Sequence, residues 1–150
     1  MTRLLVFVLI TGTVLAACSK DKFQTRPSLE LKSVNGDTFS NQNDMNIEFE
    51  FTDKEGDVND TLFMLKKRIN TIQVETLRDT VAIRIPDFPK NNQGFIRMRL
   101  STVSYLESAQ RPPVENGNAH DDTLMIRFAL KDKAGNVSDT VVLGPVYIIR

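Results

Sequence analysis

Apolar and polar residues alternate with a period of two along most of the chain after residue 28, and this pattern predicts β-strands. The clearest runs are Ile47-Glu-Phe-Glu-Phe51, Ile96-Arg-Met-Arg-Leu100 and Ile126-Arg-Phe-Ala-Leu130. Each run has one apolar and one polar face, as a strand does when only one side of its sheet is buried. No segment shows a convincing helical stripe, so the pattern favours an all-β domain.

Weaker runs complete the expected set of strands. Residues 62–65 are apolar on both faces, which predicts a central strand, with a helical turn as the alternative. The strand over residues 81–85 should end at Pro86, and Gly144-Pro145 should bend or break the last strand. Seven or eight short strands joined by polar turns predict an antiparallel, immunoglobulin-like β-sandwich, and a small β-barrel is the alternative.

One fifteen-residue pattern occurs twice. Residues 47–61 match residues 126–140 without a gap, at an offset of 79, and each copy reads as strand, turn, strand. The first aspartate of each turn can accept backbone N–H bonds across the turn. The glycine three residues later can take a positive φ where the chain reverses. We therefore expect two structural turns, built on Asp53, Gly56, Asp132, Gly135 and Asn136.

These turns carry a family resemblance. Asp-Lys-Ala-Gly-Asn-Val-Ser, in the second copy, resembles the turn before the last strand of bacterial immunoglobulin-like domains. Phe-Thr-Asp-Lys-Glu-Gly-Asp-Val, in the first, is similar to the acidic turn common in small Bacteroidetes-type lipoproteins. The resemblance implies a fold and no activity. An immunoglobulin order would send the second and third strands to different sheets, so the first copy could be a sheet-crossing corner instead of a hairpin.

The N-terminus has the features of a lipoprotein signal. Arg3 precedes an uncharged run that ends at residue 17 and is shorter than the about 20 residues that a transmembrane helix needs. Leu15-Ala16-Ala17-Cys18 resembles the bacterial lipobox, in which the cysteine receives a diacylglyceryl group and, after cleavage, an acyl chain such as palmitate. We predict a cleaved signal peptide over 1–17, a lipidated Cys18 with a tether over 18–27, and one domain over 28–150.

The anchor predicts a location in the cell envelope. Ser19 after the cysteine resembles the pattern that is passed on to the outer membrane, on either its periplasmic or its surface side. The chain has 19 Lys and Arg against 19 Asp and Glu, and removal of residues 1–17 takes away only Arg3, which leaves a net charge of −1. This balance offers no field of one sign to attract nucleic acid. With the single cysteine lipidated, no disulfide can form.

The acidic first turn has the composition of a metal site. Asp53, Glu55, Asp57 and Asp60 could supply the oxygen ligands that calcium prefers. An EF-hand loop counted from Asp53 would need glycine where Val58 stands. The second copy keeps the same pattern with fewer acids. A structural turn is therefore the favoured interpretation and calcium the alternative, and we expect no cofactor besides the covalent lipid.

A shorter pattern, Asp-Thr-aliphatic, recurs where strands are expected to begin. A structural explanation suffices, because aspartate often ends a turn and threonine favours strands. The triplet also resembles the acceptor for O-linked glycosylation of exported Bacteroidetes proteins. The candidate acceptors are Thr61, Thr80, Thr123 and Thr140.

Catalytic motifs are missing from the sequence. His120 is the only histidine and stands in a polar loop, and no second histidine or cysteine is present to build a zinc site. The sequence contains no G-x-S-x-G elbow, P-loop or H-E-x-x-H motif. We therefore predict that the protein is not an enzyme.

With catalysis not indicated by the sequence, the functions that we consider are binding functions. Charged side chains at outward strand positions predict cross-strand pairs on solvated faces: Glu48, Glu50, Arg84, Arg97, Arg99 and Arg127. We expect a lipid-anchored binding or assembly protein with an envelope protein as its partner. A glycan-binding lipoprotein that uses Phe88 and Phe95 is the alternative, and an inhibitor of a hydrolase is a third. Two long connections, 86–94 and 108–122, should help to form any binding site.

Overall fold

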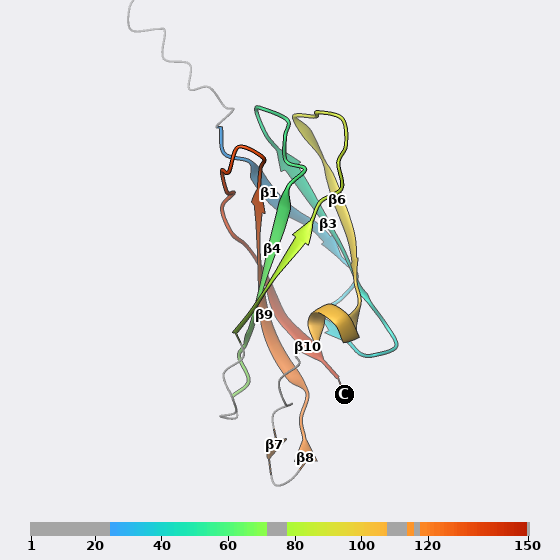
Figure 1. The fold of residues 1–150 in the computed structure, drawn as a ribbon. Helices are drawn as coiled ribbons and strands as arrows, with labels where there is room; N and C mark the ends of the chain where they lie inside the picture. Colours follow the sequence, from blue (N-terminus) through green and yellow to red (C-terminus); the bar gives the residue numbers. More distant parts are fainter. Residues whose placement is uncertain (1–24, 72–77, 108–113, 116–117, 150) are drawn as a thin grey trace, which may run out of the picture.

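The computed structural model describes residues 25–71, 78–107, 114–115 and 118–149, which form two sheets packed face to face (Figure 1). In order across the three-stranded sheet lie β1 (Ser28–Val34), β3 (Met45–Thr52) and β6 (Gln93–Leu100). In order across the five-stranded sheet lie β2 (Thr38–Phe39), β10 (Val141–Ile148), β9 (Asp122–Lys131), β4 (Thr61–Arg68) and β5 (Arg78–Arg84). A separate pair, β7 (Val114–Glu115) and β8 (Asn118–Ala119), and one helical turn, η2 (Thr102–Leu106), complete the described elements.

This architecture confirms the predicted all-β, immunoglobulin-like sandwich. Among the described residues, seven strands have seven or more residues and three have two. The two sheets do not join into a closed barrel, so the barrel alternative is wrong. Residues 62–65 lie in β4, between β9 and β5, so they form the predicted central strand and not a helical turn.

The two copies of the repeated turn connect different elements. β3 lies in the three-stranded sheet and β4 in the five-stranded sheet, so the first turn is a corner that crosses between the sheets. β9 and β10 are antiparallel neighbours, so the second turn closes a hairpin. The first copy thus follows the immunoglobulin order, in which the second and third long strands lie in different sheets.

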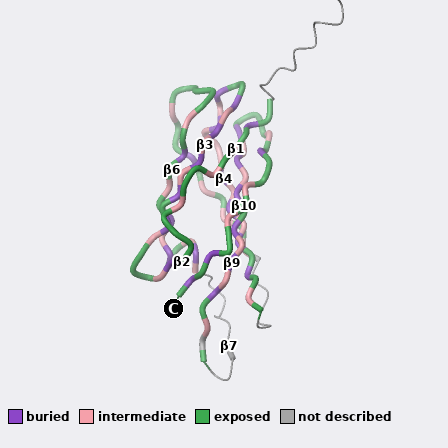
Figure 2. Tube along the Cα trace, turned by 180° about the vertical axis from the view of Figure 1, so that it is seen from behind, coloured by how far each residue is buried: buried purple, intermediate pink, exposed green. Residues whose placement is uncertain are grey.

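The core lies between the sheets, where each long strand contributes alternate residues. β3 and β9 alternate between buried and more accessible positions along their whole length (Figure 2). Phe49 from β3 meets Phe128 from β9 across the core, with ring centroids 4.9 Å apart and planes inclined by 60°. A fully buried side chain of this kind contributes about 1.5–3 kcal/mol to folding, so this alternation accounts for much of the stability.

β4 carries an exception that the sequence pattern did not predict. Its inward positions change from Leu62 and Met64 to Lys66 and Arg68, which are buried. Lys66 pairs with Asp79 at 3.1 Å and also donates to the Tyr105 carbonyl in η2. The Arg68 Nε atom donates to Asp122 at 2.6 Å. Buried cations are tolerated here because each has an acidic partner.

The last strand bends and does not break. Gly144-Pro145 lies inside β10, and the register with β9 shifts between Leu143 and Val146. Pairing resumes after the shift and continues to Ile148. The irregularity fits the absence of a backbone N–H on proline, which removes one donor from the ladder.

The chain joins the domain beside the second turn. The Arg26 Nε atom donates to the Val137 carbonyl at 2.9 Å, and the Arg26 side chain pairs with Asp139 at 3.3 Å. Asn136 Nδ2 donates to the Thr25 carbonyl at 3.1 Å. The last residues of the predicted tether are therefore held at the end of the sandwich where both repeated turns lie (Figure 1).

The predicted lipid anchor, Cys18, lies outside the described residues, as do residues 72–77 and 108–113. No helix within the described ranges is long and apolar enough to cross a membrane. The lipid anchor therefore stays a prediction from the sequence.

Candidate functional site

The two repeated turns lie side by side at one end of the sandwich. β4 pairs with β9, and this ladder begins at Thr61 opposite Lys131, next to both turns. The backbone N–H of Lys133 donates to the Asp57 carbonyl at 3.1 Å, which joins one turn directly to the other. We call this region the turn junction and define it by Asp53, Asp57 and Asp132.

The first aspartate of each copy accepts a hydrogen bond across its turn. Asp53 Oδ2 accepts from the Asp57 N–H at 3.1 Å, and Asp132 Oδ1 accepts from the Asn136 N–H at 2.7 Å. Gly56 has a φ of +66° and Gly135 a φ of +94°. A side chain on Gly56 would also crowd Asn91 and Asn92 of the next long loop, whereas the space around Gly135 is open. Local turn geometry is thus shared, and the surroundings differ.

The acidic side chains divide into two groups. One carboxylate oxygen from each of Asp53, Asp57 and Asp132 lies within 4.8 Å of the others. Glu55 is exposed, and Asp60 is paired with Lys131 at 3.1 Å. Two of the four candidate calcium ligands, Asp53 and Asp57, therefore come together, and the second turn adds Asp132. Sequence reasoning missed Asp132 as a partner, although the matching repeat placed it at the position equivalent to Asp53.

Two of these three side chains are removed from water, and the third, Asp57, is half-buried. Asp53 is 2% exposed and Asp132 is fully buried. Among the described residues, Asp53 Oδ1 and Asp57 Oδ1 are buried without a hydrogen-bond partner. Burial, followed by the charges of Asp132 and Asp53, raises the pKa of the Asp57 carboxyl above its usual range. The turn junction therefore holds oxygen atoms that can accept a proton or bind a cation.

The candidate glycosylation sites differ in accessibility. Thr80 and Thr140 are exposed, whereas Thr61 and Thr123 are half-buried. The backbone N–H of Thr123 also donates to Asn70 Oδ1 at 2.8 Å, which ties this position to the neighbouring chain. Thr80 and Thr140 are therefore the positions where a sugar would meet the least obstruction.

The solvent side of the three-stranded sheet, which we call the outer face, carries paired charges. Arg97 donates to Glu48, Arg99 pairs with Asp44 at 2.7 Å, and Lys32 pairs with Glu50 at 2.9 Å. The hydrogen bond from Lys32 holds the pKa of the Glu50 carboxyl below its usual value. Two residues of the predicted set of outward charges, Arg84 and Arg127, belong to the five-stranded sheet instead.

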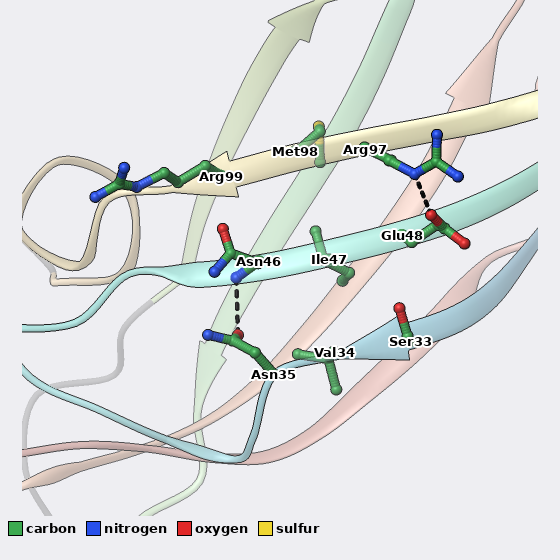
Figure 3. A pocket seen from close by; sticks show the side chains of 9 residues that line it. All are labelled: Ser33, Val34, Asn35, Asn46, Ile47, Glu48, Arg97, Met98 and Arg99. Atoms are coloured by element: carbon green, nitrogen blue, oxygen red, sulfur yellow. Dashed lines mark hydrogen bonds and ion pairs between the residues drawn. The ribbon is translucent and has the colours of Figure 1, made fainter.

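A shallow groove of about 630 Å³ crosses the outer face (Figure 3). Side chains from β1, β3 and β6 line it, with the Arg97–Glu48 pair at one side and Arg99 at the other. A second depression of about 350 Å³ lies along the loop between β5 and β6 and contains Phe88 and Phe95. Arg97 lines both depressions, so it marks the boundary between them.

The aromatic side chains near these depressions do not form a flat platform. Phe95 is 51% exposed, and the Arg97 guanidinium carbon lies 5.4 Å from the centre of its ring. Phe88 is half-buried and packs against Phe51, with ring centroids 6.0 Å apart. Of the two phenylalanines on which the glycan alternative depends, only Phe95 is exposed, and Arg97 lies over its ring.

No protein-family model and no curated protein sequence matches this chain. A solved structure that is similar in part is a β-glucosidase from Listeria innocua in complex with gluconolactone, with 10% sequence identity and a TM-score of 0.39. The match covers 82% of this chain and 16% of the β-glucosidase chain. This similarity is too low to support any argument about activity.

Proposed function

We propose that the protein is a lipid-anchored, non-catalytic binding protein of the cell envelope that docks an envelope protein partner on its outer face. The observation that carries this proposal is the position of Arg97, which covers the exposed ring of Phe95 between two depressions. Arginine and aromatic side chains are enriched among the residues that dominate protein interfaces, and depressions accept the partner's own side chains.

The ion pairs on the outer face favour binding by limiting its entropic cost. The Arg97 and Arg99 side chains are 71% and 76% exposed, yet each is held through its Nε atom by an acid on the same face. A side chain that is already oriented loses less conformational freedom when a partner arrives. We infer that the partner presents carboxylate groups to these two guanidinium groups.

The edge of the three-stranded sheet offers a second means of contact. Among the described strands, β6 pairs only with β3, so its other edge has no strand beside it. Backbone N–H and C=O groups on such an edge can pair with an extended segment of another protein. An added strand would lie next to Phe95 and Arg97.

The anchor and the absence of catalytic motifs support the rest of the proposal. The lipobox-like residues 15–18 would attach the chain to the outer membrane. Arg26 and Thr25, the described end of the predicted tether, contact the second turn, and Arg97 and Phe95 are exposed on the outer face. The sequence supplies no nucleophile, base and metal set that would favour an enzyme.

The proposal is tested by cross-linking in the native membrane. A photo-reactive amino acid replaces Phe95, and adducts are identified in three backgrounds: the natural chain, Arg97→Glu with Arg99→Glu, and Arg84→Glu with Arg127→Glu. The last pair is a matched control, because it makes the same charge change on the five-stranded sheet. We expect one adduct that survives in the control and disappears when Arg97 and Arg99 are reversed.

Circular dichroism shows whether both double variants keep the fold of the natural chain. All four arginines are exposed, so neither double variant should alter the fold. Loss of the adduct in both variants, or its persistence in both, would contradict docking on the outer face. Absence of any adduct in the natural chain would contradict the proposal as a whole.

A further inference from the structure

We propose that the turn junction binds one calcium ion, with Asp53 and Asp57 from the first turn and Asp132 from the second as its protein ligands. The three aspartates are brought together by the fold and not by their spacing in the sequence. Asp53 follows β3, Asp57 lies in the corner that leads to β4, and Asp132 follows β9. One ion would therefore connect both sheets.

The distances fit a single ion. Calcium lies about 2.3–2.6 Å from each of its oxygen ligands, so two ligands of the same ion can be separated by up to about 5 Å. The three carboxylate oxygens lie within 4.8 Å of one another. An ion between them could therefore touch all three carboxylates without a large movement of the backbone.

Unpartnered oxygen atoms distinguish this cluster from an ordinary group of surface acids. Asp53 is 2% exposed, and its Oδ1 atom is buried without a hydrogen-bond partner in the described part of the chain; the same holds for Asp57 Oδ1. A buried charge without a partner is strongly unfavourable, whereas metal coordination is one of the arrangements that stabilise it. A cation bound at the turn junction would supply the missing partner of the buried Asp53 oxygen.

Neighbouring basic side chains are engaged by other acids. Lys131 pairs with Asp60 at 3.1 Å, and Lys133 pairs with Asp87 at 3.1 Å. Both lysines flank Asp132 in sequence, and both contact carboxylates outside the turn junction. The positive charges closest to Asp132 along the chain are therefore already paired.

The ligand chemistry favours calcium over other metals. All three ligands are carboxylates, which suit hard cations, whereas zinc sites usually contain histidine or cysteine. Asp132 Oδ1 and Oδ2 already accept bonds from Asn136, but a carboxylate oxygen has a second lone pair for a metal. Calcium also tolerates irregular coordination completed by water, and magnesium demands a more regular octahedron.

Binding would stabilise the end of the domain nearest the tether. Asp132 is bonded to Asn136, and the Asn136 side chain donates to the Thr25 carbonyl. An ion at the turn junction would thus hold the corner, the hairpin and the start of the domain together. This inference is independent of partner docking on the outer face, and either proposal can fail alone.

The test is calorimetric titration of the full, chelator-treated chain with CaCl₂, together with its melting temperature. We expect one ion per chain and a melting temperature that rises with calcium concentration by mass action. Asp57→Asn should weaken calcium binding at least about tenfold, because affinity depends on ligand charge. This variant should fold, since Asn136 occupies the equivalent position of the second turn.

Glu55→Gln is the matched control, because it removes one negative charge from the same turn at an exposed side chain outside the cluster. It should bind calcium like the natural chain, and MgCl₂ should produce a smaller rise in melting temperature. Absence of heat and of any melting shift up to about 10 mM calcium, above the range of weak extracellular sites, would overturn the proposal. Equal responses in Asp57→Asn and Glu55→Gln would overturn it too, by showing general charge screening.

Discussion

The two copies of the repeated turn have similar sequences and different structural roles. Apart from the bond from the Lys133 N–H to Asp57, the second turn makes its backbone bonds within its own hairpin: the Asp132 N–H donates to the Asn136 carbonyl, and the Ser138 N–H donates to the Leu130 carbonyl. The first turn instead bonds to a distant loop, with Asp53 N–H donating to Asn92 at 2.8 Å. The comparison shows that the aspartate and glycine specify the local reversal, whereas tertiary packing decides whether the chain returns to the same sheet.

The copies also differ in what they bury. Val58 of the corner is completely buried, and the equivalent Val137 of the hairpin is 37% exposed. Asp57 of the corner is a carboxylate with an unpartnered oxygen, and the equivalent Asn136 donates to Asp132 at 2.8 Å. The hairpin therefore satisfies its own polar groups, while the corner contributes to the core and leaves acidic oxygens available.

The largest contrast should come from removing the aspartate that caps each turn. Asp132→Ala removes the bonds that Asp132 accepts from the Asn136 N–H and from the Asn136 side-chain amide, and we expect a loss of about 2–4 kcal/mol in the free energy of unfolding. Asp53→Ala breaks one hydrogen bond, from the Asp57 N–H, and also removes a buried carboxylate. In chelator it should therefore lower the free energy of unfolding by about 1 kcal/mol or less. Urea unfolding measures both; equal losses would mean that the two caps are equivalent.

The valines give the next contrast. Val58→Ala should destabilise the protein by about 2–3 kcal/mol, because it removes buried methyl groups and leaves a cavity at the corner. Val137→Ala should change the free energy of unfolding by no more than about 0.5 kcal/mol, as expected at an accessible site. The difference between their urea midpoints tests whether the corner is part of the core. Similar midpoints would show that it is not.

A reciprocal exchange should have the smallest effects. In chelator, Asn136→Asp should cost about 1–2 kcal/mol, because it replaces a donor to Asp132 with a like charge. Asp57→Asn should stabilise the protein by about 0.5–1 kcal/mol, because it removes the carboxyl that burial and its acidic neighbours disfavour in the charged form. Thermal unfolding gives both values, and a destabilising Asp57→Asn would contradict repulsion at the turn junction.

Sequence periodicity predicted the strands but not their partners. Alternation identifies the buried face of β3, β6 and β9, and it cannot specify which sheet each strand enters, because pairing depends on residues far apart in the chain. From the sequence, the first turn could therefore be predicted only as either a hairpin or a corner that crosses between the sheets. The approach of Asp132 to Asp53 follows from the pairing of β4 with β9, which no local signal reveals.

The alternation of apolar and polar residues also did not predict the charged side chains that are buried in the core. Lys66 and Arg68 continue the inward positions of β4, where a period-two analysis expects apolar side chains. Their burial depends on Asp79 and Asp122, which lie on other strands. On the outer face, the predicted cross-strand pairing was found for Arg97 with Glu48. These two residues are directly opposite each other in the ladder of β3 with β6, so their side chains meet on the same face.

The most direct test of the account is the coupling free energy between Asp57→Asn and Asp132→Asn, one from each turn, measured by urea unfolding in chelator and in saturating calcium. Any loss of the Asn136 contact in the second variant cancels in the double-mutant cycle. If the turns form one acidic site, the charges repel in chelator and cooperate around calcium, so a coupling of at least about 0.5 kcal/mol should change sign between the two conditions. Additive effects in both conditions would show that the two turns are independent and that no ion joins them.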